Sequence, residues 1–205
     1  MKPQFSTLII LTLVCAVLMV PFAVSPFYLD MLRDRSFDLH QFLRGEAYKQ
    51  GTGYAALVLV GVEMTLTMRK RSRSWSIWPK KWSIPGAVML WRTAHIFTGT
   101  ALVAFVLIHT LGASGINYNA ILLWSFFGVT LTALLGVVAE TGILESPRKI
   151  FNIGTRKVIE GKAVGIGKGA LIRGMRAVWL PSHILLVSVF GLMLAVHIFL
   201  VYYYR

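Results

Sequence analysis

Apolar residues occur along this chain in five long runs, separated by segments rich in charged and small residues. Runs of about 18 or more apolar residues are typical of membrane-spanning helices. We predict an all-α membrane protein in which residues 1–205 form a single membrane domain and backbone polar groups are hydrogen-bonded within the helices. The predicted spans are, approximately, residues 5–28, 54–68, 84–111, 120–139 and 177–204.

Composition agrees with this pattern. Hydrophobic residues make up 56% of the chain and the mean hydropathy is +0.68, which is unlike a soluble domain. The first span follows Lys2 as a signal peptide would. Its apolar core is about 20 residues long and no small-residue cleavage site follows it, so we expect a retained helix. Cys15 is the only cysteine, which excludes a disulfide within the chain and a CxxCH haem-attachment motif.

The formal net charge of +13 is concentrated in two loops, residues 69–83 and 140–176. The positive-inside rule places both loops in the cytoplasm, with the N-terminus inside and the C-terminus outside. The loop over residues 27–53 has four basic and four acidic residues, which suits the outer side. This placement argues against nucleic-acid binding. We expect a multi-pass protein of a bacterial or archaeal inner membrane. The cations of the two cytoplasmic loops include Arg69, Lys70, Arg71, Arg73, Lys80, Lys81, Arg148, Lys149, Arg156, Lys157, Lys162, Lys168, Arg173 and Arg176.

The glycine-rich stretch GKAVGIGKG (Gly161–Gly169) lies in the second basic loop. Its glycine spacing fits neither a phosphate-binding Walker loop nor a dinucleotide-binding loop. We expect this loop to lie against anionic lipid headgroups, with a docking surface for a cytoplasmic partner as the alternative. The WPKKW motif (Trp78–Trp82) is typical of an interfacial anchor.

Four of the five histidines form two pairs with the same spacing. His95 and His109 lie in the third predicted span, and His183 and His197 lie in the fifth, fourteen residues apart in both cases. Fourteen residues is close to four helical turns, so both members of a pair face the same way, about 21 Å apart along the axis. The third and fifth spans also run in the same direction across the membrane.

This arrangement predicts two levels of paired imidazoles, His95 with His183 near the inside and His109 with His197 near the outside. Two histidines on opposite sides are what a bis-histidine haem b needs. The alternatives are a single metal site, which the spacing within each pair opposes, and a proton relay, which would need carboxylates that neither span contains. For any one histidine, a satisfied core or interfacial role remains open. We therefore expect two b-type haems.

The segments WRTAHIFTGTALVAFVLIHTLG and WLPSHILLVSVFGLMLAVHIFLVYY resemble the haem-binding helices of integral-membrane di-haem cytochromes b. The likeness covers roughly residues 88–205. Its size is similar to that of the membrane subunits of modular respiratory complexes, such as the gamma subunits of nitrate reductase or the cytochrome b anchors of hydrogenases. The resemblance implies electron transfer between a membrane quinone, such as menaquinone, and an iron–sulfur or cytochrome c type partner subunit. It does not extend to the PEWY quinol motif of the quinol–cytochrome c oxidoreductases, which is absent here.

Several other residues are candidates for the cofactor sites. Arg92 shares the helical face of His95 and is expected to pair with a propionate of the inner haem. Gly99 and Gly191 would allow close approach of a porphyrin, although glycines in membrane helices also serve helix packing. Arg173 and Arg176 are further propionate candidates on the inner side, with a positive-inside anchor as the alternative. On the outer side, Ser114, Asn117, Tyr202 and Arg205 are candidates for propionates or a quinone headgroup, with an aromatic belt and a snorkelling end as the alternative for the Tyr-Tyr-Tyr-Arg terminus.

Two carboxylates and one histidine stand apart from these sets. Glu63 and Glu140 lie inside or at the inner end of predicted spans, where they would either relay protons or pair with a neighbouring helix or loop cations. His40, in the outer loop, is expected to be an ordinary surface residue.

These features predict a non-catalytic electron-transfer subunit of a quinone-linked oxidoreductase complex. One alternative is a self-sufficient transmembrane reductase, in which the histidines usually occupy four helices. The other is a non-redox anchor or small transporter core.

Overall fold

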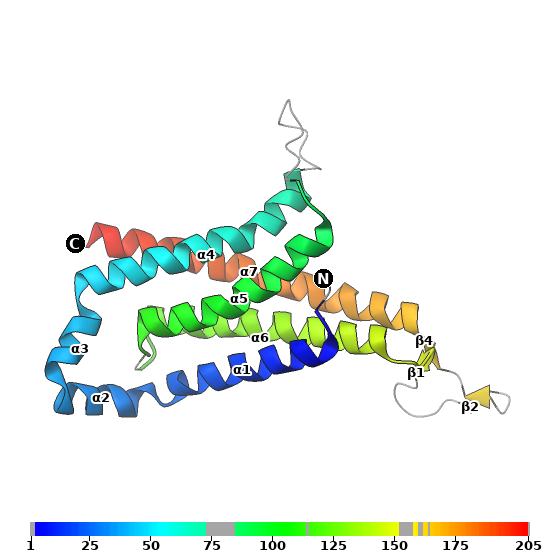
Figure 1. Ribbon diagram of the computed structural model, residues 1–205, viewed down its shortest axis with the longest axis horizontal. Coiled ribbons are helices and arrows are strands. Elements are labelled where there is room, and N and C mark those ends of the chain that lie inside the picture. Colours follow the sequence, from blue (N-terminus) through cyan, green and yellow to red (C-terminus); the bar gives the residue numbers. More distant parts are fainter. Residues whose placement is uncertain are drawn as a thin grey trace. The chain divides into compact units, whose positions relative to one another are not determined.

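The computed structural model of the chain describes residues 3–72, 85–113, 115–151, 158–159, 162–163 and 165–204. The described residues form an all-α fold with short hairpin strands in one loop (Figure 1). Five of the helices are long and apolar enough to cross a membrane, as the hydropathy pattern predicts. The helices are α1 (Phe5–Ala23), α2 (Ser25–Arg35), α3 (Phe37–Arg44), α4 (Glu46–Ser72), α5 (Val88–Thr110), α6 (Tyr118–Glu145) and α7 (Lys168–Tyr203).

The chain divides into two compact units. The first contains residues 1–3 and 13–123, and the second contains residues 4–12 and 124–205. The α4–α5 pair therefore belongs to the first unit. The pairing of α6 with α7 belongs to the second.

The helices differ from the predicted spans mainly at their ends. Helix α1 stops at Ala23, five residues before the predicted end, and α2 follows with a proline in its first turn, where a missing N–H costs nothing. Helix α4 begins at Glu46 rather than at residue 54, and α7 begins at Lys168 rather than at residue 177. Hydropathy detects only the apolar part of a helix, whereas lysine, glutamate and glutamine extend helices well beyond it.

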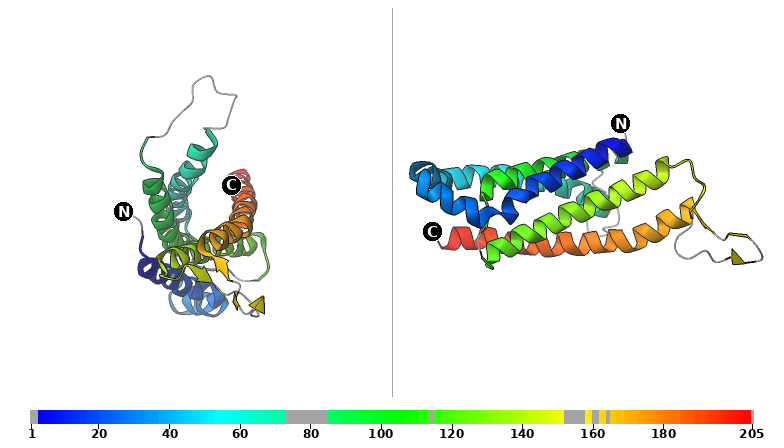
Figure 2. Two further views of the ribbon diagram at one scale, coloured as in Figure 1. Left: turned by 90° about the vertical axis from the view of Figure 1, so that its right-hand side faces the viewer. Right: turned by 90° about the horizontal axis from the view of Figure 1, so that it is seen from below.

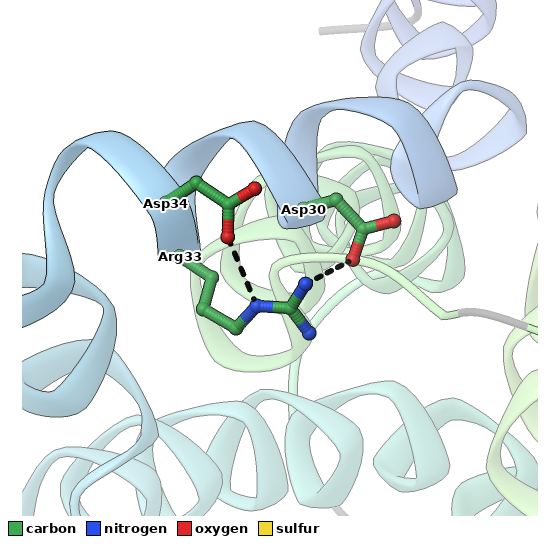
Figure 3. Close-up of polar contacts among 3 residues, drawn as sticks. All are labelled: Asp30, Arg33 and Asp34. Carbon is green, nitrogen blue, oxygen red and sulfur yellow. Dashed lines mark hydrogen bonds and ion pairs between the residues drawn. The ribbon is translucent and has the colours of Figure 1, made fainter.

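The outer loop predicted between the first two spans is largely helical. Helix α2 has an ion network on its surface, in which the Arg33 guanidinium lies 3.5 Å from Asp30 and donates to Asp34 at 3.2 Å (Figure 3). All three side chains are more than half exposed, so this network contributes little to stability. Helix α3 exposes Phe37 and Phe42. Exposed aromatic residues beside charged ones suit a segment at the membrane–water interface.

Helices α4 and α5 lie side by side and run antiparallel in the first unit (Figure 1). At one end of the pair, Arg69 on α4 is buried and donates to the carbonyl of Gly86, just before α5, at 2.5 Å. At the other end, Tyr48 and Lys49 on α4 donate to the carbonyls of Ile108 and His109, at 3.0 and 2.5 Å. The last carbonyls of a helix lack partners within it, and a lysine there also complements the helix dipole.

The turn after α5 is held by the junction of α1 and α2. Leu111 adopts a left-handed conformation with φ 58°, and Gly112 has φ 134°. The Ser25 hydroxyl donates to the Ala113 carbonyl at 2.6 Å, and the Tyr28 hydroxyl donates to the Leu111 carbonyl. Burial raises the pKa of Tyr28 above its ordinary value. A side chain at position 112 would collide with Ser25 and Tyr28, so this turn requires glycine.

Helices α6 and α7 lie side by side in the second unit (Figure 2). The Trp179 indole N–H donates to the Thr132 carbonyl at 2.9 Å, and its ring occupies the space that a side chain at Gly136 would need. Further along the pair, the rings of Phe126 and Phe190 lie 5.6 Å apart. Close approach at a small residue is the usual means of packing membrane helices.

The basic loop before α7 contains two small antiparallel hairpins, which the sequence did not predict. Strand β1 (Ile150–Phe151) pairs with β4 (Ile166–Gly167), and β2 (Val158–Ile159) pairs with β3 (Lys162–Ala163). Residues 168–176, expected to be loop, form the first turns of α7. The predicted WPKKW anchor and five of the loop cations, Arg73, Lys80, Lys81, Arg156 and Lys157, lie outside the described residues.

We expect Gly136→Ala to destabilise the protein by about 1–3 kcal/mol, because the added methyl overlaps the Trp179 indole. Gly128→Ala, on the same helix, is the matched control, since a methyl there meets nothing within 4 Å. Thermal unfolding of both variants in detergent measures the difference. Equal stability of the two variants would contradict the close packing at Gly136.

Candidate functional site

Helix α5 presents its two histidines to the same neighbour. His95 and His109 both contact side chains of α4, His95 near the inner end predicted from charge and His109 near the outer end. The prediction that this pair shares one helical face is therefore confirmed. Both contacts are made by the Nδ1 atom of the ring.

Glu63 on α4 is the partner of His95. Its Oε2 lies 2.5 Å from His95 Nδ1, and the Glu63 side chain is only 12% exposed. An isolated carboxylate inside an apolar helix pair is costly, and a basic partner offsets that cost. Of the two roles expected for Glu63, a proton relay or a pairing with a neighbouring helix, the structure shows the pairing, and its partner is one of the four histidines.

Gly99 faces this pair, since a Cβ at that position would lie 3.6 Å from Glu63 Oε2. The structure thus places the small residue beside the Glu63 carboxylate. Close approach of a porphyrin at Gly99 stays a prediction.

Thr52 on α4 is the partner of His109. The Thr52 hydroxyl lies 3.0 Å from His109 Nδ1. A Cβ at Gly53 would lie 3.2 Å from His109 Cε1, so the absence of a side chain there gives the imidazole room against α4. Neither Thr52 nor Gly53 was predicted as a site residue. One sequence feature could have identified Thr52 as a site residue. It lies eleven residues before Glu63, which is about three helical turns and places both residues on the same face of the helix.

Helix α7 carries the second histidine pair. His183 and His197 are both half-buried, and the His183 ring stacks on Trp179 with centroids 6.2 Å apart. Since Trp179 bonds to α6, this stacking fixes one side of the His183 ring. A Cβ at Gly191, between the two histidines, meets nothing within 4 Å, so the α7 surface there is open.

The two pairs belong to different units of the structure, His95 and His109 to the first and His183 and His197 to the second. The pairing of His95 with His183 and of His109 with His197 therefore stays a prediction. Among the described residues, no three His, Cys, Asp or Glu side chains gather as a metal site would require. An ion held by two of these histidines would take its remaining ligands from a cofactor or solvent.

Glu140 and Arg176 form a second buried contact, within the second unit. Arg176 donates to both carboxylate oxygens of Glu140, at 3.2 and 2.5 Å. The Glu140 side chain is 2% exposed and that of Arg176 is 49% exposed. Of the two roles considered for Glu140, the structure shows pairing with a neighbouring helix. The Arg176 guanidinium, proposed for a haem propionate, has this carboxylate as its partner.

The remaining predicted residues have varied surroundings. Arg92 is half-buried on α5, and Arg173 is exposed on α7. The Asn117 side chain accepts a hydrogen bond from the Ala120 N–H at 2.9 Å, as a helix N-cap does. Tyr202 is half exposed near the end of α7. His40 is half-buried on α3. The other two outer candidates, Ser114 and Arg205, lie outside the described residues.

Comparison of the chain with protein-family models, curated proteins and solved structures finds no match. The fold defines the class: over the described residues, an all-α protein with five helices long and apolar enough to cross a membrane. Two of these helices, α5 and α7, carry the paired histidines.

Removing the partner of Glu140 should destabilise the second unit. We expect Arg176→Ala to cost about 1–3 kcal/mol, because it leaves a buried carboxylate without its donor. The cost stays below that of a fully buried pair because half of the Arg176 side chain is exposed.

Arg173→Ala is the control, since Arg173 is an exposed cation on the same helix, and we expect a change within about 0.5 kcal/mol. Thermal unfolding of the two variants measures this. An equally large loss of stability in Arg173→Ala would show that the second unit depends on positive charge along α7 rather than on the contact between Glu140 and Arg176.

Proposed function

We propose that the chain holds two b-type haems and transfers electrons across the membrane between a quinone and a partner redox subunit. Its role is that of an electron-transfer subunit, with substrate chemistry on the partner. The observation that carries the proposal is the matched spacing of the histidine pairs on α5 and α7, of which the α5 pair is held by polar groups of α4.

The surroundings of the α5 histidines fit haem ligation. A histidine that binds a metal almost always directs its other ring nitrogen to a carboxylate, a carbonyl or another polar group, which selects the tautomer and the ring orientation. The Nδ1 atoms of His95 and His109 meet Glu63 and Thr52 in this way. When haems are bound, His95 and His109 would each supply an imidazole nitrogen to the iron of one haem.

The surroundings of the α7 histidines also fit haem ligation. The stacking of His183 on Trp179 restrains its ring, and the open surface at Gly191 leaves room for a flat ligand between the levels of His183 and His197. When bound, a haem supplies a one-electron centre. The chain would supply the imidazole nitrogens, the apolar surroundings and, on the inner side, Arg92 as the candidate partner of a propionate.

Haem content tests the proposal directly. The purified full-length chain from haem-replete cells should contain two non-covalent haems per polypeptide, with a reducible b-type absorption spectrum. A pyridine haemochrome assay against protein concentration measures the stoichiometry. A haem-free preparation would overturn the proposal in favour of a non-redox anchor, and reduction by ascorbate without a partner subunit would favour the self-sufficient reductase.

The pairing of ligands has a test of its own. His197→Ala should lose one haem, the outer one, and keep the inner haem bound by His95 and His183. His40→Ala is the matched control, because it removes a histidine that lies on α3, and it should keep both haems. Loss of both haems in His197→Ala, with the fold intact by circular dichroism, would contradict two separate sites.

A further inference from the structure

The two histidines of α5 have partners of different charge. His95 Nδ1 lies 2.5 Å from the carboxylate of Glu63, whereas His109 Nδ1 lies 3.0 Å from the neutral hydroxyl of Thr52. All four residues come from one antiparallel pair, α4 and α5, within a single unit. The difference in charge between the two partners is therefore determined by the residues of α4, and it does not depend on how the two units are placed.

A carboxylate acts on a metal-bound imidazole in two ways. Its negative charge beside Nδ1 makes the ring a stronger electron donor through Nε2, which an uncharged hydroxyl does less. As an anion it also favours the more positive, oxidised state of a nearby iron. The effect is large where water is excluded, and the Glu63 side chain is 12% exposed within a predicted span.

We propose that Glu63 is a positioning residue for the inner haem, one that holds the His95 imidazole with Nε2 toward the iron and lowers the reduction potential of that haem. This inference rests on the proposed function, because it takes His95 as an axial ligand. Thr52 holds His109 in the corresponding orientation without a charge. The two haem sites thus differ by one anion, supplied by α4.

The surrounding cations do not replace this effect. Arg69 and Arg92 lie toward the same end of the α4–α5 pair and favour the reduced state of an inner haem. Arg69 is engaged with the carbonyl of Gly86. Substitution of Glu63 alone leaves both cations in place. A difference in the midpoint potential of the inner haem between wild type and variant therefore reports the effect of the carboxylate.

The experiment is a redox titration of the purified full-length chain, followed by absorbance and by low-temperature paramagnetic resonance. In Glu63→Gln, which keeps the shape and loses the charge, we expect the midpoint potential of the inner haem to rise while that of the outer haem is unchanged. Glu63→Asp should restore a value close to wild type. Thr52→Val should leave the inner haem unshifted. Repeating Glu63→Gln in the His197→Ala background assigns the shifted signal to the inner haem.

Glu46→Gln is the matched control, since Glu46 is an exposed carboxylate in the first turn of the same helix, and it should shift neither potential. Loss of the inner haem from Glu63→Gln but not from Glu63→Asp would also support the positioning role. Two bound haems with an unshifted inner potential in Glu63→Gln would overturn this inference alone. A wild-type chain without haem would overturn the proposed function, and this inference with it.

Discussion

A carboxylate that lies between apolar helices requires a basic partner, and this constraint organises both units of the protein. In the first unit Glu63 on α4 meets His95 on α5, and in the second Glu140 on α6 meets Arg176 on α7. Water does not compensate a charge at such depth, so each pair restricts how its two helices slide and rotate against one another.

The two pairs differ in the basic side chain and in the nitrogen atoms that it uses for the contact. Arg176 uses two of its donors on the oxygens of Glu140, which gives a planar two-bond contact suited to joining helices. A histidine in contact through Nδ1 still carries a second ring nitrogen, Nε2. The Glu63 contact therefore orients a potential ligand while it joins α4 to α5. This chemical difference is why the first pair enters the proposed redox function and the second is assigned to packing.

Helix α4 has a larger role than its modest hydropathy suggests. Along its length it provides Tyr48, Lys49, Thr52 and Glu63 to α5, so it caps the end of that helix and contacts both of its histidines. Gly53 admits the ring of His109 at the same surface. A helix that packed only through apolar residues would leave both imidazoles free to rotate. Here α4 acts as the orienting scaffold for the histidine-bearing helix.

Hydropathy and spacing were sufficient to predict the five spans, the all-α class and the common face of His95 and His109, because these depend on local periodicity along one helix. Hydropathy did not predict the ends of α4 and α7 or the helices α2 and α3, because charged residues extend helices without a hydropathy signal. The hairpins of the basic loop were not predicted either. The contacts of Glu63 with His95, Thr52 with His109 and Glu140 with Arg176 emerged only from the folded chain. Each joins residues on separate helices, and a partner of that kind depends on how two helix faces meet, which periodicity within either helix does not encode.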